Sequence, residues 1–144
     1  MNEARSSQRL PEDEGMERGR VLVVDEVRHT AYLMRFQLER AGYQVEVESD
    51  GDEVRARVEE FEPHAVILDV VLPGRSGLEL CRELRRDFPD LRIMIHTGQG
   101  FESRRDESGW ADADAHFTKP MSPQRLLRRL EALGVQPRIG APVD

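Results

Sequence analysis

The 144-residue chain has few of the features that mark secreted and membrane proteins. It contains one cysteine, Cys81, so no internal disulfide can form, and a reducing cytoplasm is the simplest setting. No run approaches the roughly 18 apolar residues that span a bilayer. Residues 1–19 lack the apolar centre of a signal peptide. These absences predict a cytoplasmic protein with no membrane partner.

Positive charge is also in deficit. The chain has 21 Lys and Arg residues against 28 Asp and Glu, which give a formal net charge of −7. Proteins that bind nucleic acid usually carry a net basic surface. The composition therefore predicts that nucleic acid is not a partner.

The length and apolar content are those of one folded domain. Hydrophobic residues make up 38% of the sequence, an ordinary level for globular chains. Residues 1–19 mix charges of both signs and have little to bury, which predicts a flexible polar tail. We expect the folded domain to cover residues 20–134 and a short C-terminal tail to cover residues 135–144.

Strand-like and helix-like patterns alternate through the folded region. Five short apolar runs predict strands at residues 21–25, 43–49, 65–71, 92–97 and 115–118. Amphipathic stripes with capping residues predict helices near residues 31–41, 54–61, 76–88 and 122–133. A weaker pattern anchored by Phe101 and Trp110 predicts one more helix over residues 99–112.

This alternation predicts a doubly wound α/β fold, in which five helices cover both faces of a five-stranded parallel sheet. The purely apolar runs at 21–24 and 65–68 suit central strands that are buried on both faces. We expect the flavodoxin-like strand order 2-1-3-4-5.

Acidic residues end two of the predicted central strands. Asp25 and Glu26 follow the first strand, and Asp69 ends the third. In the flavodoxin-like order these two strands flank the crevice where the strand order reverses. Three carboxylates in one crevice repel one another at a cost unless a proton or a cation offsets their charge. We expect Mg²⁺, because it takes oxygen ligands and commonly bridges a carboxylate to a phosphate.

A hydroxyl and an amine end the next two strands. Thr97 ends the fourth strand and can donate to an anion, while Lys119 ends the fifth and suits phosphate. A carboxylate flanked by a metal, a lysine and a hydroxyl is placed to attack a phosphorus centre. The residues therefore predict Asp69 as a nucleophile in phosphoryl transfer.

Each of these features has an ordinary interpretation when it is taken alone. The acidic pair could cap a helix, Lys119 could be a solvated lysine at a turn, and Thr97 could simply end a strand. Their shared position at strand ends favours one common site. His64 and His96 have no second ligand at metal spacing, and we interpret both as structural.

Four separated signatures make residues 20–134 resemble a response-regulator receiver domain of the CheY-like, single-domain type. They are the acidic pair Asp25-Glu26, the stretch "LDVVLPGRSG" around Asp69, "HTG" with Thr97 and "FTKP" with Lys119. Each signature is weak alone, but together and in this order they are specific to that family of two-component signalling proteins.

The resemblance implies that Asp69 accepts a phosphoryl group from a histidine kinase or a phosphotransfer protein. The Mg²⁺ ligands that it implies are Asp25, Glu26, Asp69 and the backbone carbonyl of Val71. Thr97 and Lys119 would contact the phosphoryl oxygens. The protein would be a signalling switch rather than an enzyme, and it would catalyse no more than its own phosphorylation and dephosphorylation.

The resemblance also implies a switch that reaches a downstream protein. In such domains Thr97 moves toward the phosphoryl group and lets an aromatic side chain of the fifth strand turn inward. His116 occupies that aromatic position here, and Glu26 stands where aspartate is commoner. A homodimer through the last two helices is a further expectation from the resemblance.

Three classes of function compete. The leading hypothesis is a stand-alone phosphoacceptor, because no output domain follows Gly134. A degenerate receiver that acts as a phosphorylation-independent interaction module is the alternative, although the chain keeps the full set of site residues. A phosphatase of this fold would want a second aspartate where Val71 stands, and a flavin carrier would want a hydroxyl-rich loop where the chain has EVRH.

Overall fold

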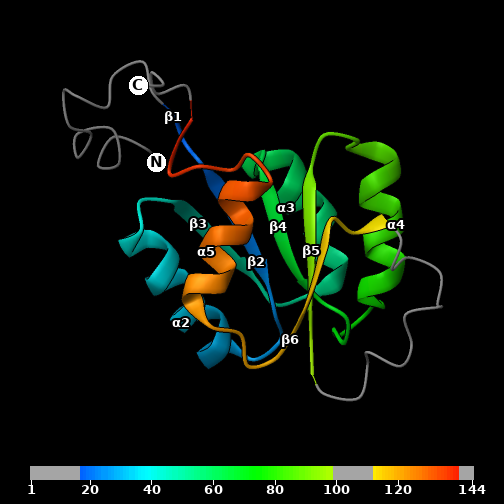
Figure 1. Cartoon of the computed structure of the whole chain (residues 1–144). Helices are drawn as coiled ribbons and strands as arrows, with labels where there is room; N and C mark the ends of the chain where they lie inside the picture. The colour runs from blue at the N-terminus through cyan, green and yellow to red at the C-terminus, as the bar shows by residue number, and fades with distance from the viewer. Residues whose placement is uncertain (1–16, 99–111, 140–144) are drawn as a thin grey trace.

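A five-stranded parallel sheet forms the centre of the computed structural model, which describes residues 17–98 and 112–139 (Figure 1). Its strands are β2 (Arg20–Val24), β3 (Gln44–Glu48), β4 (Ala65–Asp69), β5 (Arg92–Thr97) and β6 (Ala115–Thr118). The sheet order is β3-β2-β4-β5-β6, and all four pairings are parallel. The predicted fold class and the predicted strand order are therefore confirmed.

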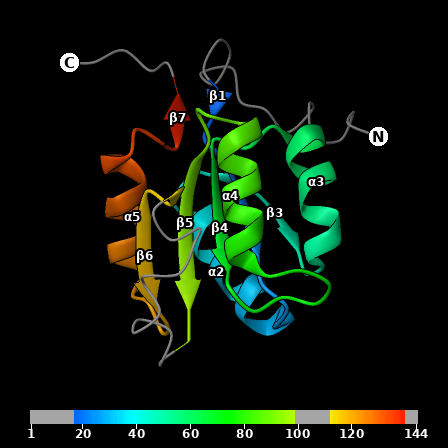
Figure 2. The same ribbon diagram turned by 90° about the vertical axis from the view of Figure 1, so that its right-hand side faces the viewer.

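Helices cover both faces of the sheet. They are α2 (Arg28–Arg40), α3 (Val54–Phe61), α4 (Gly77–Asp87) and α5 (Pro123–Ala132), with a short 3₁₀ turn, η2 (Gly51–Glu53), before α3. The helices α3 and α4 pack on one face, and α2 and α5 pack on the other (Figure 2). The fifth predicted helix falls mainly on residues 99–111, which lie outside the described residues.

The central strands are buried on both faces, which explains their continuous apolar sequence. In β2, Val21 and Val23 join the core under α2 and α5, whereas Leu22 and Val24 join the core under α3 and α4. The same alternation runs through β4 and β5. Because successive side chains of a strand point to opposite faces, each of these strands contributes to both cores.

The helix ends follow the capping signals in the sequence. The Ser76 hydroxyl accepts the Leu78 amide at the start of α4, and the Ser122 hydroxyl accepts the Arg125 amide at the start of α5. The Asp50 carboxylate accepts the Asp52 amide, so it caps η2 rather than α3 itself. Local sequence therefore sets where these elements begin.

The two ends of the described structure meet at the amino edge of the sheet. Two residues from each predicted tail pair as a small antiparallel ribbon of β1 (Glu17–Arg18) and β7 (Arg138–Ile139). Strands of two residues carry no periodicity, which is why the sequence patterns do not predict them. None of the described helices combines the length and the apolar character needed to cross a membrane.

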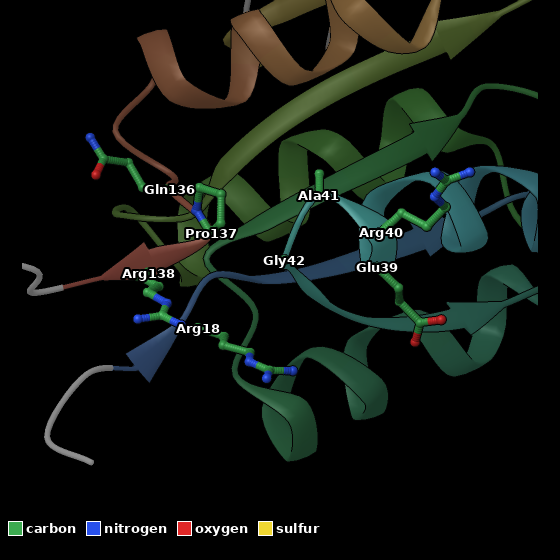
Figure 3. A pocket seen from close by; sticks show the side chains of 8 residues that line it. All are labelled: Arg18, Glu39, Arg40, Ala41, Gly42, Gln136, Pro137 and Arg138. Atoms are coloured by element: carbon green, nitrogen blue, oxygen red, sulfur yellow. The ribbon is translucent and has the colours of Figure 1, made fainter. Parts of the chain in front are cut away.

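Glycines allow the close packing at this edge. A pocket of about 550 Å³ lies where the end of α2 meets the strand β7, and Figure 3 shows Gly42 facing Pro137 there. Gly42 has a positive φ of 106°, and a Cβ atom on it would lie 3.0 Å from the Cβ atom of Pro137. The Tyr43 hydroxyl donates to the carbonyl of Val135 at 2.7 Å.

Candidate functional site

Three charged side chains converge at the carboxyl edge of the sheet. The Lys119 Nζ atom donates to Asp69 Oδ2 at 2.9 Å and to Asp25 Oδ2 at 3.1 Å. Asp25 follows β2, Asp69 ends β4 and Lys119 follows β6. Parallel strands present their carboxyl ends at one edge, so residues far apart in the sequence meet there.

Each carboxylate is also held by its own loop. The Val27 amide donates to Asp25 Oδ1 at 2.9 Å, and the Val71 amide donates to Asp69 Oδ1 at 3.2 Å. The exposed fractions of Asp25 and Asp69 are 2% and 6%. Both carboxylates are therefore buried and fixed in orientation, with one oxygen on the backbone and the other on the shared ammonium.

Burial and the neighbouring charges shift the pKa values of Asp69 and Lys119. Burial raises the pKa of Asp69 above its usual value, against the lowering effect of Lys119 and of the Val71 amide. Burial alone would lower the pKa of Lys119, but the hydrogen bonds and charges of Asp69 and Asp25 raise it. Two carboxylates sharing one ammonium leave negative charge at this edge, which favours a further cation.

The donor set fits magnesium. Mg²⁺ commonly binds through one or two carboxylates, keeps several waters and bridges to phosphate. Asp25 and Asp69 supply two carboxylates that already converge on one cation. The Glu26 side chain is exposed, and in the described part of the chain no three acidic, histidine or cysteine residues gather as a metal cluster. The structure therefore does not bring Glu26 into the group.

Thr97 lies beside Lys119 at the same edge. The Thr97 carbonyl accepts the Lys119 amide at 2.6 Å, and 2% of Thr97 is exposed. The Lys119-Pro120 peptide bond is cis. The structure thus brings Thr97, Lys119 and the two aspartates to one edge, as the sequence predicts.

The two neighbouring residues of β6 point to opposite faces. Phe117 is buried in the core under α2 and α5, whereas the side chain of His116 is exposed. In the described structure the predicted switch residue is therefore a surface residue, and Phe117 is a core residue.

His96, which we interpret from the sequence as structural, is a further polar residue of this edge. It pairs in register with Asp69, and 4% of it is exposed. Its Nε2 atom has no hydrogen-bond partner among the described residues. Burial lowers the pKa of His96 to about 4, and the Lys119 charge adds to this effect. The sequence signal that could have placed His96 near the site is its position directly before Thr97, in a strand that ends there.

A family model for the response regulator receiver domain matches residues 21–131. The chain belongs to the response regulator receiver domain family. Receiver domains are the signalling switches of two-component response regulators, and the four signatures in the sequence lie inside the matched region.

Relatives support the same assignment. The response regulator MprA of Mycolicibacterium vanbaalenii is 40% identical over 114 residues, which cover 79% of this chain and 49% of that protein. The alkaline phosphatase synthesis transcriptional regulatory protein PhoP of Bacillus subtilis is 34% identical over 123 residues, which cover 85% of this chain and 51% of that protein. The receiver chain thus spans about half the length of these curated relatives.

Solved structures have the same architecture. The response regulator protein TrrA of Thermotoga maritima, in complex with Mg²⁺-BeF, aligns with a TM-score of 0.73 and 28% identity. The alignment covers 80% of this chain and 98% of that one.

Proposed function

We propose that this receiver accepts a phosphoryl group on Asp69 from a histidine kinase or a phosphotransfer protein, in a reaction that needs Mg²⁺. A carboxylate oxygen of Asp69 attacks the phosphorus, and the phosphorus–nitrogen bond of the donor phosphohistidine breaks, with its electron pair left on nitrogen. The observation that carries the proposal is the convergence of Asp25, Asp69 and Lys119 within hydrogen-bond distance.

The ion would be held by Asp25, Asp69 and the backbone carbonyl of Val71, with Glu26 acting through a water from its exposed position. When bound, Mg²⁺ offsets charge on the phosphoryl oxygens. The TrrA complex with Mg²⁺-BeF supports this assignment by relationship.

The remaining site residues stabilise the transferred group. Lys119 already carries its ammonium beside Asp69 Oδ2, so it can move onto a phosphoryl oxygen that replaces its carboxylate acceptors. Thr97, buried at the same edge, would donate its hydroxyl to a second phosphoryl oxygen. His116 as part of the switch stays a prediction, because the described structure shows it only as an exposed residue.

The output of the switch is a phosphorylation-dependent contact with a downstream protein. Stand-alone action stays a prediction, because it rests on where the chain ends and the curated relatives are about twice as long. The cytoplasmic location, the homodimer and the absence of a nucleic-acid partner also stay predictions.

The direct test is to incubate the protein with Mg²⁺ and acetyl phosphate and to measure its intact mass. We expect one added phosphoryl group on the wild type and none on Asp69→Asn or in excess chelator. Label that persists in Asp69→Asn would place the acceptor elsewhere, and label that forms in chelator would remove the metal from the reaction.

The same experiment addresses the degenerate receiver. A wild-type protein that stays unlabelled, while a second receiver is labelled by the same donor, would favour an interaction module that takes no phosphate. Retention of the buried Asp25, Asp69 and Lys119 group argues against that outcome.

A further inference from the structure

Glu48 is a buried carboxylate that the proposed chemistry does not use. It ends β3, and 9% of it is exposed. A buried carboxylate is costly unless hydrogen bonds and an opposite charge compensate it. Its partners therefore indicate what it does.

Both oxygens of Glu48 have partners. Oε2 accepts the backbone amides of Ser49 and Asp50, each at 3.0 Å. Oε1 accepts from Arg57, at 3.2 Å from Nη2 and 3.4 Å from Nε. The carboxylate thus holds the first two amides of the turn that leads from β3 into η2.

That turn touches the loop of the candidate site. The Gly51 amide donates to the Pro73 carbonyl at 3.1 Å, and a Cβ atom on Gly51 would lie 3.0 Å from that oxygen. At the start of the turn, the backbone carbonyl of Glu48 accepts the Asp25 amide at 3.1 Å. Hydrogen bonds therefore run from the backbone of Asp25, through Glu48 and its turn, to the loop that carries Val71.

We propose that Glu48 is a positioning residue for the magnesium site. It holds the 49–53 turn against the 70–76 loop, and so it sets how far Asp25 lies from the backbone of Val71. The inference rests on the proposed function, which takes both residues as Mg²⁺ ligands. Groups that orient metal ligands typically contribute about 10- to 100-fold to metal affinity.

Glu46 is a matched control on the same strand. It also bonds Arg57, with Oε1 at 3.5 Å from Nη1, and it carries the same charge. Within the described ranges its side chain accepts no backbone amide of the turn. Replacing Glu46 therefore changes the charge and the arginine contact, but it leaves the turn intact.

The experiment measures binding of Mg²⁺ alone to the full chain by calorimetry. We expect Glu48→Ala to raise the Kd for Mg²⁺ about tenfold or more, and Glu46→Ala to leave it within about twofold. Glu48→Gln should fall between them, because its amide oxygen can still accept from Ser49 and Asp50. In metal-free protein, hydrogen exchange of the Gly51 amide should be faster in Glu48→Ala than in Glu46→Ala.

The labelling reaction separates positioning from a general loss of structure. With Glu48→Ala, we expect acetyl phosphate labelling to need more Mg²⁺ but to recover its wild-type rate at saturating Mg²⁺. A rate that stays low at saturation in a folded variant would assign Glu48 a different role.

Equal Mg²⁺ affinities for folded Glu48→Ala and Glu46→Ala would overturn the inference and leave the proposed function standing. If Glu48→Ala does not fold, Gly51→Ala tests the other end of the connection, and a wild-type Kd in that variant would equally overturn it. A wild type that binds no Mg²⁺ would overturn the proposed function and the inference together.

Discussion

Polar groups at the two edges of the central sheet differ in how many partners they have. At the amino edge they are matched in pairs: the Arg20 amide donates to His64 Nδ1 at 2.9 Å, and Arg92 Nε donates to the Leu133 carbonyl at 3.0 Å. At the carboxyl edge, Asp25 and Asp69 share the ammonium of one lysine.

The difference follows from what each edge does. Matched hydrogen bonds at the amino edge join β2 to the residue before β4, and β5 to the residue after α5, so they contribute to stability. The carboxyl edge keeps excess negative charge and a His96 nitrogen that has no partner in the described part of the chain, and both cost stability in the unliganded protein. Substitutions at the amino edge should therefore change stability alone, whereas those at the carboxyl edge should change ligand chemistry or relieve a cost to stability.

The largest expected effect comes from Lys119→Met. We expect acetyl phosphate labelling to slow by about a hundredfold, because the phosphoryl oxygens lose a positive partner. Mg²⁺ should bind more tightly, because the ammonium no longer competes for Asp25 Oδ2 and Asp69 Oδ2. Labelling kinetics and calorimetry measure the two effects. Weaker Mg²⁺ binding in the variant would show that the lysine and the metal do not compete.

The second prediction concerns the pH dependence of stability at the carboxyl edge. The pKa of His96 is lowered from 6.5 to about 4, so between these values the unfolded chain binds a proton that the folded chain does not. His96 therefore makes the folded protein less stable as the pH falls from 6.5 to 4, by about 3 kcal/mol at most, and the loss is absent above pH 6.5.

The variant His96→Leu isolates this effect. Its stability advantage over the wild type should be about 1 kcal/mol at pH 7, from removal of a nitrogen that the described residues leave unsatisfied, and should grow as the pH falls to 4. Urea denaturation at several pH values measures it. An advantage that does not depend on pH would contradict the buried neutral state of His96.

The smallest expected effect lies at the amino edge. A Cβ atom on Gly19 would lie 2.3 Å from the Gln136 carbonyl oxygen and 3.1 Å from the Tyr43 ring. We expect Gly19→Ala to lower the free energy of unfolding by about 1–3 kcal/mol, because the new methyl group overpacks this edge. Labelling per folded molecule should not change, because the site lies at the opposite edge.

Gly98→Ala is the matched control for this stability measurement, since a Cβ atom there meets none of the described atoms within 4 Å. Equal denaturation midpoints for the two alanine variants would mean that the contact at Gly19 relaxes without cost.

Much of the fold could be predicted from the sequence because its signals are local. The apolar runs that became β2 and β4 are buried on both faces, and Ser76 and Ser122 cap the helices that follow them. The strand order is one of the two common orders of doubly wound parallel sheets. The two-residue strands β1 and β7 have no such local signal, because their pairing is made between the two ends of the chain.

The residues of the candidate site also divide into those with a local sequence signal and those placed by tertiary contacts. Asp25, Asp69, Thr97 and Lys119 are recognisable because each polar residue ends an apolar strand. Glu46 and Glu48 are indistinguishable in the sequence QVEVE, since they share one strand and one face. Their different burial depends on the turn after β3 and on Arg57, which are tertiary neighbours.

The sequence by itself determined the alternation of strands and helices and the polar residues at the strand ends, because periodicity and caps act over a few neighbouring residues. The tertiary structure decided which charges share a partner: it placed Lys119 between two aspartates, left Glu26 exposed and buried His96 and Glu48. The physical reason is that burial and hydrogen bonding between distant segments depend on packing, which no local pattern encodes.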